Sequence, residues 1–288
     1  MKWTVMKLVR RAAEILSERG IPSPRLDAEL LMCRLLGWDS RVKIYTDYDR
    51  PLSEDEVDAY RQLIKRRVKG EPVAYITGEK EFFGFKFKVN PAVLIPRPET
   101  EFLVEKSVEL LKVMDREKLR IVDVGTGSGC VIISIAKLLK KNAKFFGTDI
   151  SKNALAVAAE NADIHGCNIT FLETDLLEGI EGPFSAVVSN PPYIAYSDNR
   201  IEENVKKFEP STALYGGERG TEIIERLAFQ AFNKLEKGGF LAVECGDGQF
   251  KEVRSIFEKA SFKDIEVVKD LSGKDRVVVG FKKGVKNV

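Results

Sequence analysis

The stretch RIVDVGTGSGCVIISIAKLL, residues 120–139, decides the fold. Residues 120–124 are mostly β-branched or aliphatic, which predicts a buried strand, and the apolar run at residues 131–139 predicts a helix. Between them, the glycines of GTGSG allow a tight turn and let a ligand approach the backbone closely. A strand, a glycine-rich turn and a helix in this order predict a nucleotide-binding α/β unit, with free N–H groups at the helix start.

The spacing within the turn narrows the choice of ligand. Gly125-Thr126-Gly127-Ser128-Gly129 has the pattern GxGxG, and Cys130 stands where a dinucleotide fingerprint has its third glycine. A pyrophosphate site is therefore a poorer interpretation than a turn that cradles a methionine moiety.

Polar residues follow the next strands, which we expect at residues 144–148, 169–174 and 184–188. Asp149 ends the first of these, where an acid can accept hydrogen bonds from both hydroxyls of a ribose. Asp175 and Leu176 end the second and suit the edge and face of an adenine. Ligands bind beyond the carboxyl ends of the strands in such sheets, so these side chains are expected to face one crevice.

The third of these strands stops at Asn190-Pro191-Pro192-Tyr193, because two prolines cannot continue a β-ladder. The Asn190 side-chain oxygen and the Pro191 carbonyl can each accept one N–H from a planar NH2 group. The Tyr193 ring can pack on the plane of such a group and favour developing positive charge. The simpler interpretation is a turn after a strand.

The rest of the chain completes a two-part organisation. Further strands are expected at residues 240–244, 262–268 and 276–281, the last two as an antiparallel pair. That makes seven strands, with helices at residues 221–235 and 249–259. The architecture predicted for this part is a doubly wound α/β sheet.

The N-terminal residues 1–75 predict a small helical bundle, with helices over residues 5–16 and 24–36, a short element near 45–48, and a helix after a Ser53/Glu56 capping box. Residues 76–100 form a connector in which alternating Phe83, Phe85 and Phe87 predict a β-hairpin. Thr100 is expected to cap the helix at residues 101–114.

Composition excludes several classes of protein. The 288 residues carry a net charge of +2 without a long single-sign run, which argues against a protein that grips nucleic acid by its phosphates. The four cysteines are widely spread and there is one histidine, so no metal site is expected. No secretory signal or apolar run of about 20 residues appears, and we expect a soluble, cytoplasmic monomer without membrane contact.

The sequence as a whole resembles a known family. The glycine turn, Asp149 and Asn190 to Tyr193 together look like a class I S-adenosylmethionine (SAM) methyltransferase acting on a planar nitrogen. Three further stretches resemble the HemK/PrmC family, the protein-(glutamine-N5) methyltransferases of peptide-chain release factors. They are Pro72–Gly78, Leu94–Glu101, and Glu209-Pro210 with Ala213-Leu214 and Gly216-Gly217.

The resemblance implies a reaction and roles for the motif residues. The glutamine amide of a Gly-Gly-Gln motif in a class 1 release factor would receive a methyl group from SAM, without a metal. The turn at residues 125–129 would lie along the methionine part. Asp149 would bind the ribose, with Asp175 and Leu176 near the adenine. The Asn190-Pro191-Pro192-Tyr193 motif would bind the amide, with Asn190 also bordering SAM. Residues 1–75 would dock the release factor, and residues 101–288 would form the methyltransferase domain.

Three alternatives remain open from the residues alone. An amino-methyltransferase acting on a nucleic-acid base needs a basic groove or a target-recognition domain, and the sequence shows neither. An NAD-dependent oxidoreductase would be expected to carry a third glycine in the turn, and this glycine is missing. A non-catalytic module that has kept the fold is the third alternative, against which the intact Asn190 and Asp149 argue.

Overall fold

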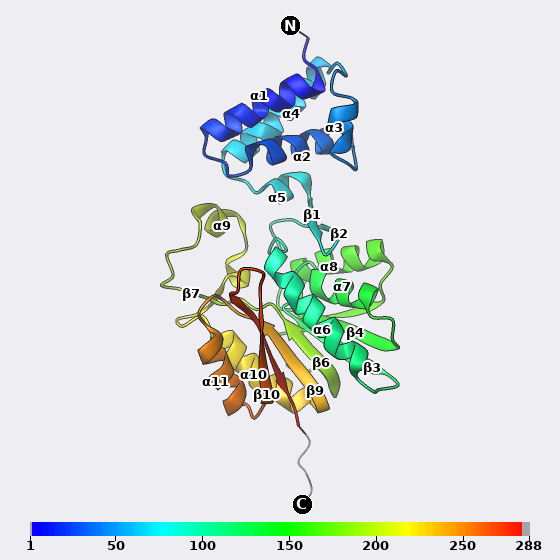
Figure 1. The fold of residues 1–288 in the computed structure, drawn as a ribbon, viewed down its shortest axis with the longest axis vertical. Coiled ribbons are helices and arrows are strands. Elements are labelled where there is room, and N and C mark those ends of the chain that lie inside the picture. The colour runs from blue at the N-terminus through cyan, green and yellow to red at the C-terminus, as the bar shows by residue number, and fades with distance from the viewer. Residues whose placement is uncertain (1, 284–288) are drawn as a thin grey trace, which may run out of the picture. The chain divides into compact units, whose positions relative to one another are not determined.

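A computed structural model of the protein describes residues 2–283, which divide into two compact units (Figure 1). The first comprises residues 2–79 together with α9 (Glu203–Phe208), and the second comprises residues 80–202 and 209–283. The addition of α9 to the N-terminal unit could not be foreseen, because its sequence lies far along the chain. The domain limits predicted at residues 75 and 100 stay predictions.

The first unit is a helical bundle, as predicted. Its other helices are α1 (Val5–Glu18), α2 (Pro24–Leu36), α3 (Val42–Thr46), α4 (Glu54–Val68) and α5 (Val73–Thr77). The predicted capping box is present, since the Ser53 side chain accepts from the Glu56 N–H and the Glu56 carboxylate accepts from the Ser53 N–H. Tyr60 is buried in the core and donates to the Ala28 carbonyl over 2.7 Å, which satisfies its hydroxyl.

The second unit is built on a seven-stranded sheet of order β10-β11-β9-β6-β3-β4-β5. The strands are β3 (Leu119–Val124), β4 (Ala143–Asp149), β5 (Ile169–Glu173), β6 (Phe184–Ser189), β9 (Leu235–Glu244), β10 (Lys263–Lys269) and β11 (Asp275–Phe281). The strands β9, β6, β3, β4 and β5 are parallel, whereas β11 runs antiparallel to both β9 and β10. The predicted seven-stranded doubly wound sheet with a terminal antiparallel pair is confirmed.

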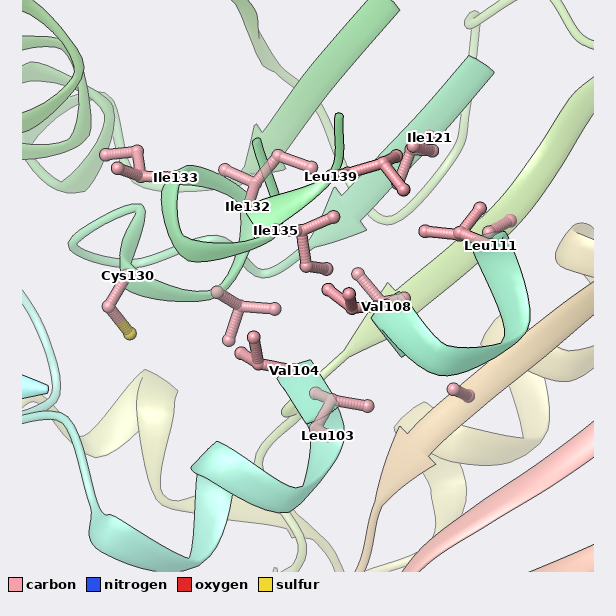
Figure 2. Close-up of a cluster of buried hydrophobic side chains, with 14 of the residues drawn as sticks. Leu103, Val104, Val108, Leu111, Ile121, Cys130, Ile132, Ile133, Ile135 and Leu139 are labelled. Carbon is pink, nitrogen blue, oxygen red and sulfur yellow. The ribbon is translucent and has the colours of Figure 1, made fainter. Parts of the chain in front are cut away.

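Alternation along the strands explains why helices cover both faces (Figure 1). Ile121 packs on one face with α6 (Glu101–Val113) and α7 (Cys130–Leu138), and Figure 2 shows this cluster. Its neighbour Val122 packs on the other face with α10 (Glu222–Lys234) and α11 (Phe250–Lys259). Successive side chains of a strand point to opposite faces, so a continuously apolar strand is buried on both. The remaining helix of this unit, α8 (Lys152–His165), connects β4 to β5.

The connector forms a hairpin whose register differs from the prediction. Its strands are β1 (Glu79–Phe82) and β2 (Phe85–Lys88), so Phe83 lies in the turn, with a φ of 52°, instead of alternating with Phe85 and Phe87. Phe82 is buried, edge-to-face with Phe87 at 6.1 Å between ring centroids. Burial of Phe82 fixes the register, because a shift of one residue would turn its side chain to the opposite face.

Short elements complete the second unit. The strands β7 (Ile194–Ala195) and β8 (Tyr215–Gly217) pair in parallel. The 3₁₀ turn η2 (Ser211–Ala213) lies between them in sequence, and the 3₁₀ turn η1 (Pro98–Thr100) directly precedes α6. None of these was predicted. The strand β9 starts at Leu235, earlier than the predicted residue 240, and runs through Gly238 and Gly239.

Candidate active site

A cavity opens in the second unit at the carboxyl ends of β3, β4 and β6, as the topology of a parallel sheet predicts. About 1070 Å³ of space, open solvent included, lies between its lining residues. The predicted residues that line it are Gly125, Thr126, Gly127, Ser128, Asp149, Asp175, Leu176, Asn190 and Pro192. Gly129, Pro191 and Tyr193 are not among the lining residues.

The glycine turn presents bare backbone to this cavity. Gly125 and Gly127 have φ values of 69° and 54°, a conformation that L-residues with side chains rarely adopt. A Cβ at either position would meet nothing within 4 Å, so the glycines leave open space next to the backbone. Gly129 serves a different purpose, since a Cβ there would come within 3.0 Å of Ile133 and 3.3 Å of Ala158. It lets α7 start tightly against α8.

Asp149 closes the turn from the end of β4. Its Oδ2 accepts the Gly127 N–H over 3.0 Å, and its Oδ1 accepts the Ser151 N–H over 2.9 Å. Burial raises the pKa of Asp149, while the hydrogen bonds from Ser151 and Gly127 lower it. The carboxylate is thus held in a fixed orientation at the cavity wall, with lone pairs left for a ligand.

A further acid of the site, Asp123, was missed by the sequence reasoning. It is 1% exposed, lines the cavity, and its Oδ2 accepts from the Thr126 hydroxyl over 2.7 Å. Burial raises the pKa of Asp123 to about 7, although the hydrogen bond from Thr126 acts in the opposite direction. An acid within an otherwise apolar strand was the signal that could have revealed it, because buried carboxylates are rare.

Another wall of the cavity is formed by residues that come directly after β5 in sequence. Leu176 has a φ of 54°, and its carbonyl accepts from the Thr148 hydroxyl over 2.9 Å, which holds this uncommon backbone in place. Asp175 forms an ion pair with Arg226 of α10 over 2.6 Å, and Arg226, which was not predicted, also lines the cavity. Both side chains are about half exposed, so the pair is open to competition from a ligand.

Asn190 lies at the end of β6 and is held by a residue of the connector. Its Nδ2 donates to the Thr100 Oγ1 over 2.9 Å, which leaves Oδ1 as the atom that can accept from a ligand. The prediction that Thr100 caps α6 is wrong. Thr100 ends the 3₁₀ turn η1 with φ −67° and ψ −17°, so it lacks the extended backbone of an N-cap, and its hydroxyl contacts Asn190 instead.

Two motif segments that are distant in sequence meet at another wall. The Glu209 carboxylate, 2% exposed, accepts the Ile95 N–H over 3.1 Å and forms an ion pair with Arg97. Arg97 and Pro210 both line the cavity. Both segments support the family resemblance in the sequence, and the structure shows that Glu209 ties them together.

Solved structures share the fold of the second unit. A methyltransferase from Pyrococcus furiosus has a TM-score of 0.53 at 20% identity, with 78% of this chain and 98% of that chain covered. The Thermus thermophilus 16S rRNA N2 G1207 methyltransferase, solved with AdoMet and guanosine, has a TM-score of 0.52 at 16% identity, with 71% and 50% covered. The fold is therefore that of the class I SAM-dependent methyltransferases.

Sequence comparison identifies the particular family. The PrmC N-terminal domain matches residues 7–78, and the methyltransferase small domain matches residues 104–208. The release factor glutamine methyltransferase of Geobacter sulfurreducens is 38% identical over 280 residues, covering 96% of both chains. That of Koribacter versatilis is 42% identical over 283 residues, covering 97% of this chain and 99% of the relative. The chain belongs to the release factor glutamine methyltransferase family.

Within residues 2–283, no helix combines the length and apolar character needed to cross a lipid bilayer.

Proposed function

We propose that the protein transfers the methyl group of SAM to the side-chain amide nitrogen of the glutamine in the Gly-Gly-Gln motif of class 1 peptide-chain release factors. Membership of the family over nearly the whole chain supports this substrate. The single structural observation that carries it is the orientation of Asn190, whose Nδ2 is engaged by Thr100 so that Oδ1 can accept from an amide NH2.

The residues around the cavity fit SAM. The open backbone at Gly125 and Gly127 suits the methionine part, and the fixed carboxylate of Asp149 suits the two ribose hydroxyls. Asp175 and Leu176 would bind the adenine. When bound, SAM supplies an electrophilic methyl group on a positively charged sulfur, and the acidic side chains of the cavity would favour that positive charge.

The protein's own contribution to the reaction is orientation and electrostatics. Asn190 Oδ1 and the Pro191 carbonyl would each accept one N–H of the glutamine amide and aim its nitrogen at the methyl group. Pro192 would border the amide, and the Tyr193 ring would face it and favour developing positive charge. The methylated nitrogen would be strongly acidic and would release its proton to water after transfer, so no strong general base is required.

The helical unit is the proposed docking surface for the release factor. It carries its own buried core and none of the proposed cofactor residues, which all lie in the second unit. Its family match, the PrmC N-terminal domain, is separate from that of the methyltransferase domain. We also propose that the protein acts as a monomer in the cytoplasm, where translation factors work.

Methyl transfer from labelled SAM tests the proposal directly. Purified class 1 release factor, the same factor with the Gly-Gly-Gln glutamine replaced by alanine, and ribosomal RNA are offered in parallel. We expect label only on the unaltered release factor. Label on the RNA, or equal label on both release factors, would contradict the proposed substrate.

A further inference from the structure

One face of α10 reaches the proposed adenine site, although no ligand-binding role was predicted for this helix. Ile223, Arg226 and Gln230 are spaced at i, i+3 and i+7, which places them on the same side of the helix. Ile223 and Arg226 line the cavity together with Asp175 and Leu176. The helix is therefore placed to shape the cavity wall that follows β5.

The backbone of this wall has an uncommon conformation and is held in place from two sides. Leu176 has a φ of 54°, which a residue with a side chain adopts only at a cost in free energy. Its carbonyl accepts from the Thr148 hydroxyl over 2.9 Å, on the side of β4. The next N–H, that of Leu177, donates to Gln230 Oε1 over 2.9 Å, on the side of α10. Side chains of β4 and α10 thus fix two consecutive residues of the wall.

Arg226 holds the residue that precedes them, Asp175. Its Nη2 donates to Asp175 Oδ2 over 2.6 Å, whereas Glu178 Oε1 lies 3.6 Å from the same nitrogen. Only the shorter of these contacts is a hydrogen bond, so the guanidinium orients Asp175. Because Arg226 engages Oδ2, the Oδ1 atom of Asp175 can accept a hydrogen bond from a ligand in the cavity.

We propose that Arg226 is a positioning residue that makes the cavity select an adenine, by holding the Asp175 carboxylate toward the 6-amino group of the base. This role rests on the proposed function, which places the adenine of SAM beside Asp175 and Leu176. It adds a residue of α10 to the cofactor site and gives that site a preference among purine bases.

The chemistry of the purine edge explains how one ion pair can select a base. The 6-amino group of adenine donates hydrogen bonds, and an ion-paired carboxylate only accepts them. Hypoxanthine carries a carbonyl at position 6, so its oxygen would face the carboxylate as a second acceptor. A mobile carboxylate could turn to the N1–H of hypoxanthine instead, whereas one held by Arg226 stays aimed at position 6. The fixed orientation converts the difference between the bases into a difference in affinity.

The experiment measures the affinity for two stable ligands by calorimetry, S-adenosylhomocysteine and its deaminated counterpart S-inosylhomocysteine. They differ only at the edge of the purine, where a 6-carbonyl replaces the 6-amino group. We expect the parent to bind the adenine ligand about tenfold to a hundredfold more tightly, the scale of one hydrogen bond to a charged group. Equal affinities for the two ligands would overturn the proposal.

Two substitutions of Arg226 test its part in this preference. Arg226→Met keeps an apolar stem without the charge, and it should lower the ratio of the two affinities about threefold to fivefold, the upper range for a half-exposed ion pair. Arg226→Lys should stay within about twofold of the parental ratio, because the contact with Asp175 uses a single nitrogen that an ammonium can replace. An unchanged ratio in Arg226→Met would overturn the role of Arg226.

The matched control is Arg254→Met in α11. Arg254 is as exposed as Arg226 and pairs with Glu258 over 3.1 Å, but it does not line the cavity. Both ligands should bind this variant as they bind the parent. An equal fall of the ratio in the control would show a general effect of lost positive charge and would contradict the proposal.

Asp175→Asn tests whether Arg226 acts through Asp175. A neutral amide can turn to donate or to accept, so the ratio of affinities should fall close to one. The double variant of Arg226→Met and Asp175→Asn should show no further fall, because no carboxylate remains for Arg226 to orient. A further fall as large as that of Arg226→Met alone would show that Arg226 acts independently and would overturn the positioning role.

The outcomes separate this role from the proposed function. A parent that binds neither ligand overturns the cofactor site and the role of Arg226 together. A parent that binds the adenine ligand and methylates the release factor, with the same ratio in Arg226→Met, overturns the role of Arg226 alone. The expected ratios in a parent that does not methylate the release factor would support Arg226 and contradict only the proposed substrate.

Discussion

The two halves of the cavity are built in different ways. The proposed cofactor half uses residues that follow one another closely, since Asp149 in β4 binds the N–H of Gly127 in the preceding turn. The proposed amide half gathers residues from distant segments: Thr100 and Asn190 are 90 positions apart, and Ile95 and Glu209 are 114 positions apart. The glycine turn and Asp149 are thus a local property of one βαβ unit, whereas the proposed amide half depends on the assembled sheet and connector.

If the halves are functionally separate, Asn190→Ala gives the largest effect, on rate alone. Removing one oriented hydrogen-bonding group at a reacting centre costs on the order of 10²–10³ in rate, by analogy with the loss of an oxyanion-hole donor. SAM affinity should remain close to that of the parent. Stopped assays with labelled SAM and calorimetry measure the two quantities, and the exposed Asn153→Ala serves as the matched control. Equal rates for Asn190→Ala and the parent would show that the motif is only a turn after a strand, without a role in methyl transfer.

Asp149→Ala tests the other half and should act on cofactor affinity. Loss of charge-assisted hydrogen bonds to the ribose is worth roughly 1.5–3 kcal/mol, which corresponds to about a tenfold to hundredfold weaker dissociation constant for SAM. The KM for the release factor should change little. Calorimetry with SAM measures the effect, with the exposed Asp163→Ala as control. Unchanged SAM affinity would remove Asp149 from the cofactor site.

Glu244→Gln tests a buried acid of the proposed amide half through the pH dependence of the unfolding free energy. The pKa of Glu244 is raised to about 7 in the folded protein, from about 4.3 when unfolded, so the folded state binds the proton more tightly. Its contribution to stability is fully present below about pH 4 and is lost as the pH rises through about 7. Relative to the parent, the Gln variant should gain on the order of 3 kcal/mol in unfolding free energy over that window. Denaturant titrations at several pH values check this, and a pH-independent difference would contradict the raised pKa.

Glu209→Gln should give the smallest effect, a modest loss of unfolding free energy. Glu209 joins the two motif segments in the cavity wall. Its buried carboxylate binds the Ile95 N–H and pairs with Arg97, and a neutral amide would lose about 1–2 kcal/mol of unfolding free energy. The matched control is Glu225→Gln at the more exposed Arg219 pair, where a change within about 0.5 kcal/mol is expected. Equal losses of unfolding free energy at the two sites would show that the buried Glu209 contacts stabilise the fold no more than the exposed ion pair does.

This contrast also explains what could be predicted from the sequence. The strand, the glycine turn and Asp149 are encoded by local spacing, and the structure places the turn and Asp149 together at one cavity. Local rules suggested that Thr100 caps a helix, because a threonine directly precedes an apolar helical run. Its contact with Asn190 arises only when η1 and β6 are brought together by the sheet, which local spacing does not reveal.

The remaining omissions have the same physical origin. Glu244 is a buried acid whose partner Tyr193 comes from another segment, and it belongs to none of the stretches noted in the sequence. Glu209 lies in one of those stretches, but local spacing does not reveal its contact with Ile95. Phe83 was assigned to a strand by alternation, but it occupies the turn because burial of Phe82 and Phe87 sets the register. Periodicity identified the elements, while long-range packing decided which side chains meet.

The position of the transferred methyl group tests the central claim most directly. A class 1 release factor is incubated with SAM and the parent enzyme, digested, and mapped by tandem mass spectrometry, with Asn190→Ala in parallel. The account predicts one added methyl group, on the side-chain amide nitrogen of the Gly-Gly-Gln glutamine, and almost none with the variant. A methyl group on another residue, or equal methylation by the variant, would contradict it.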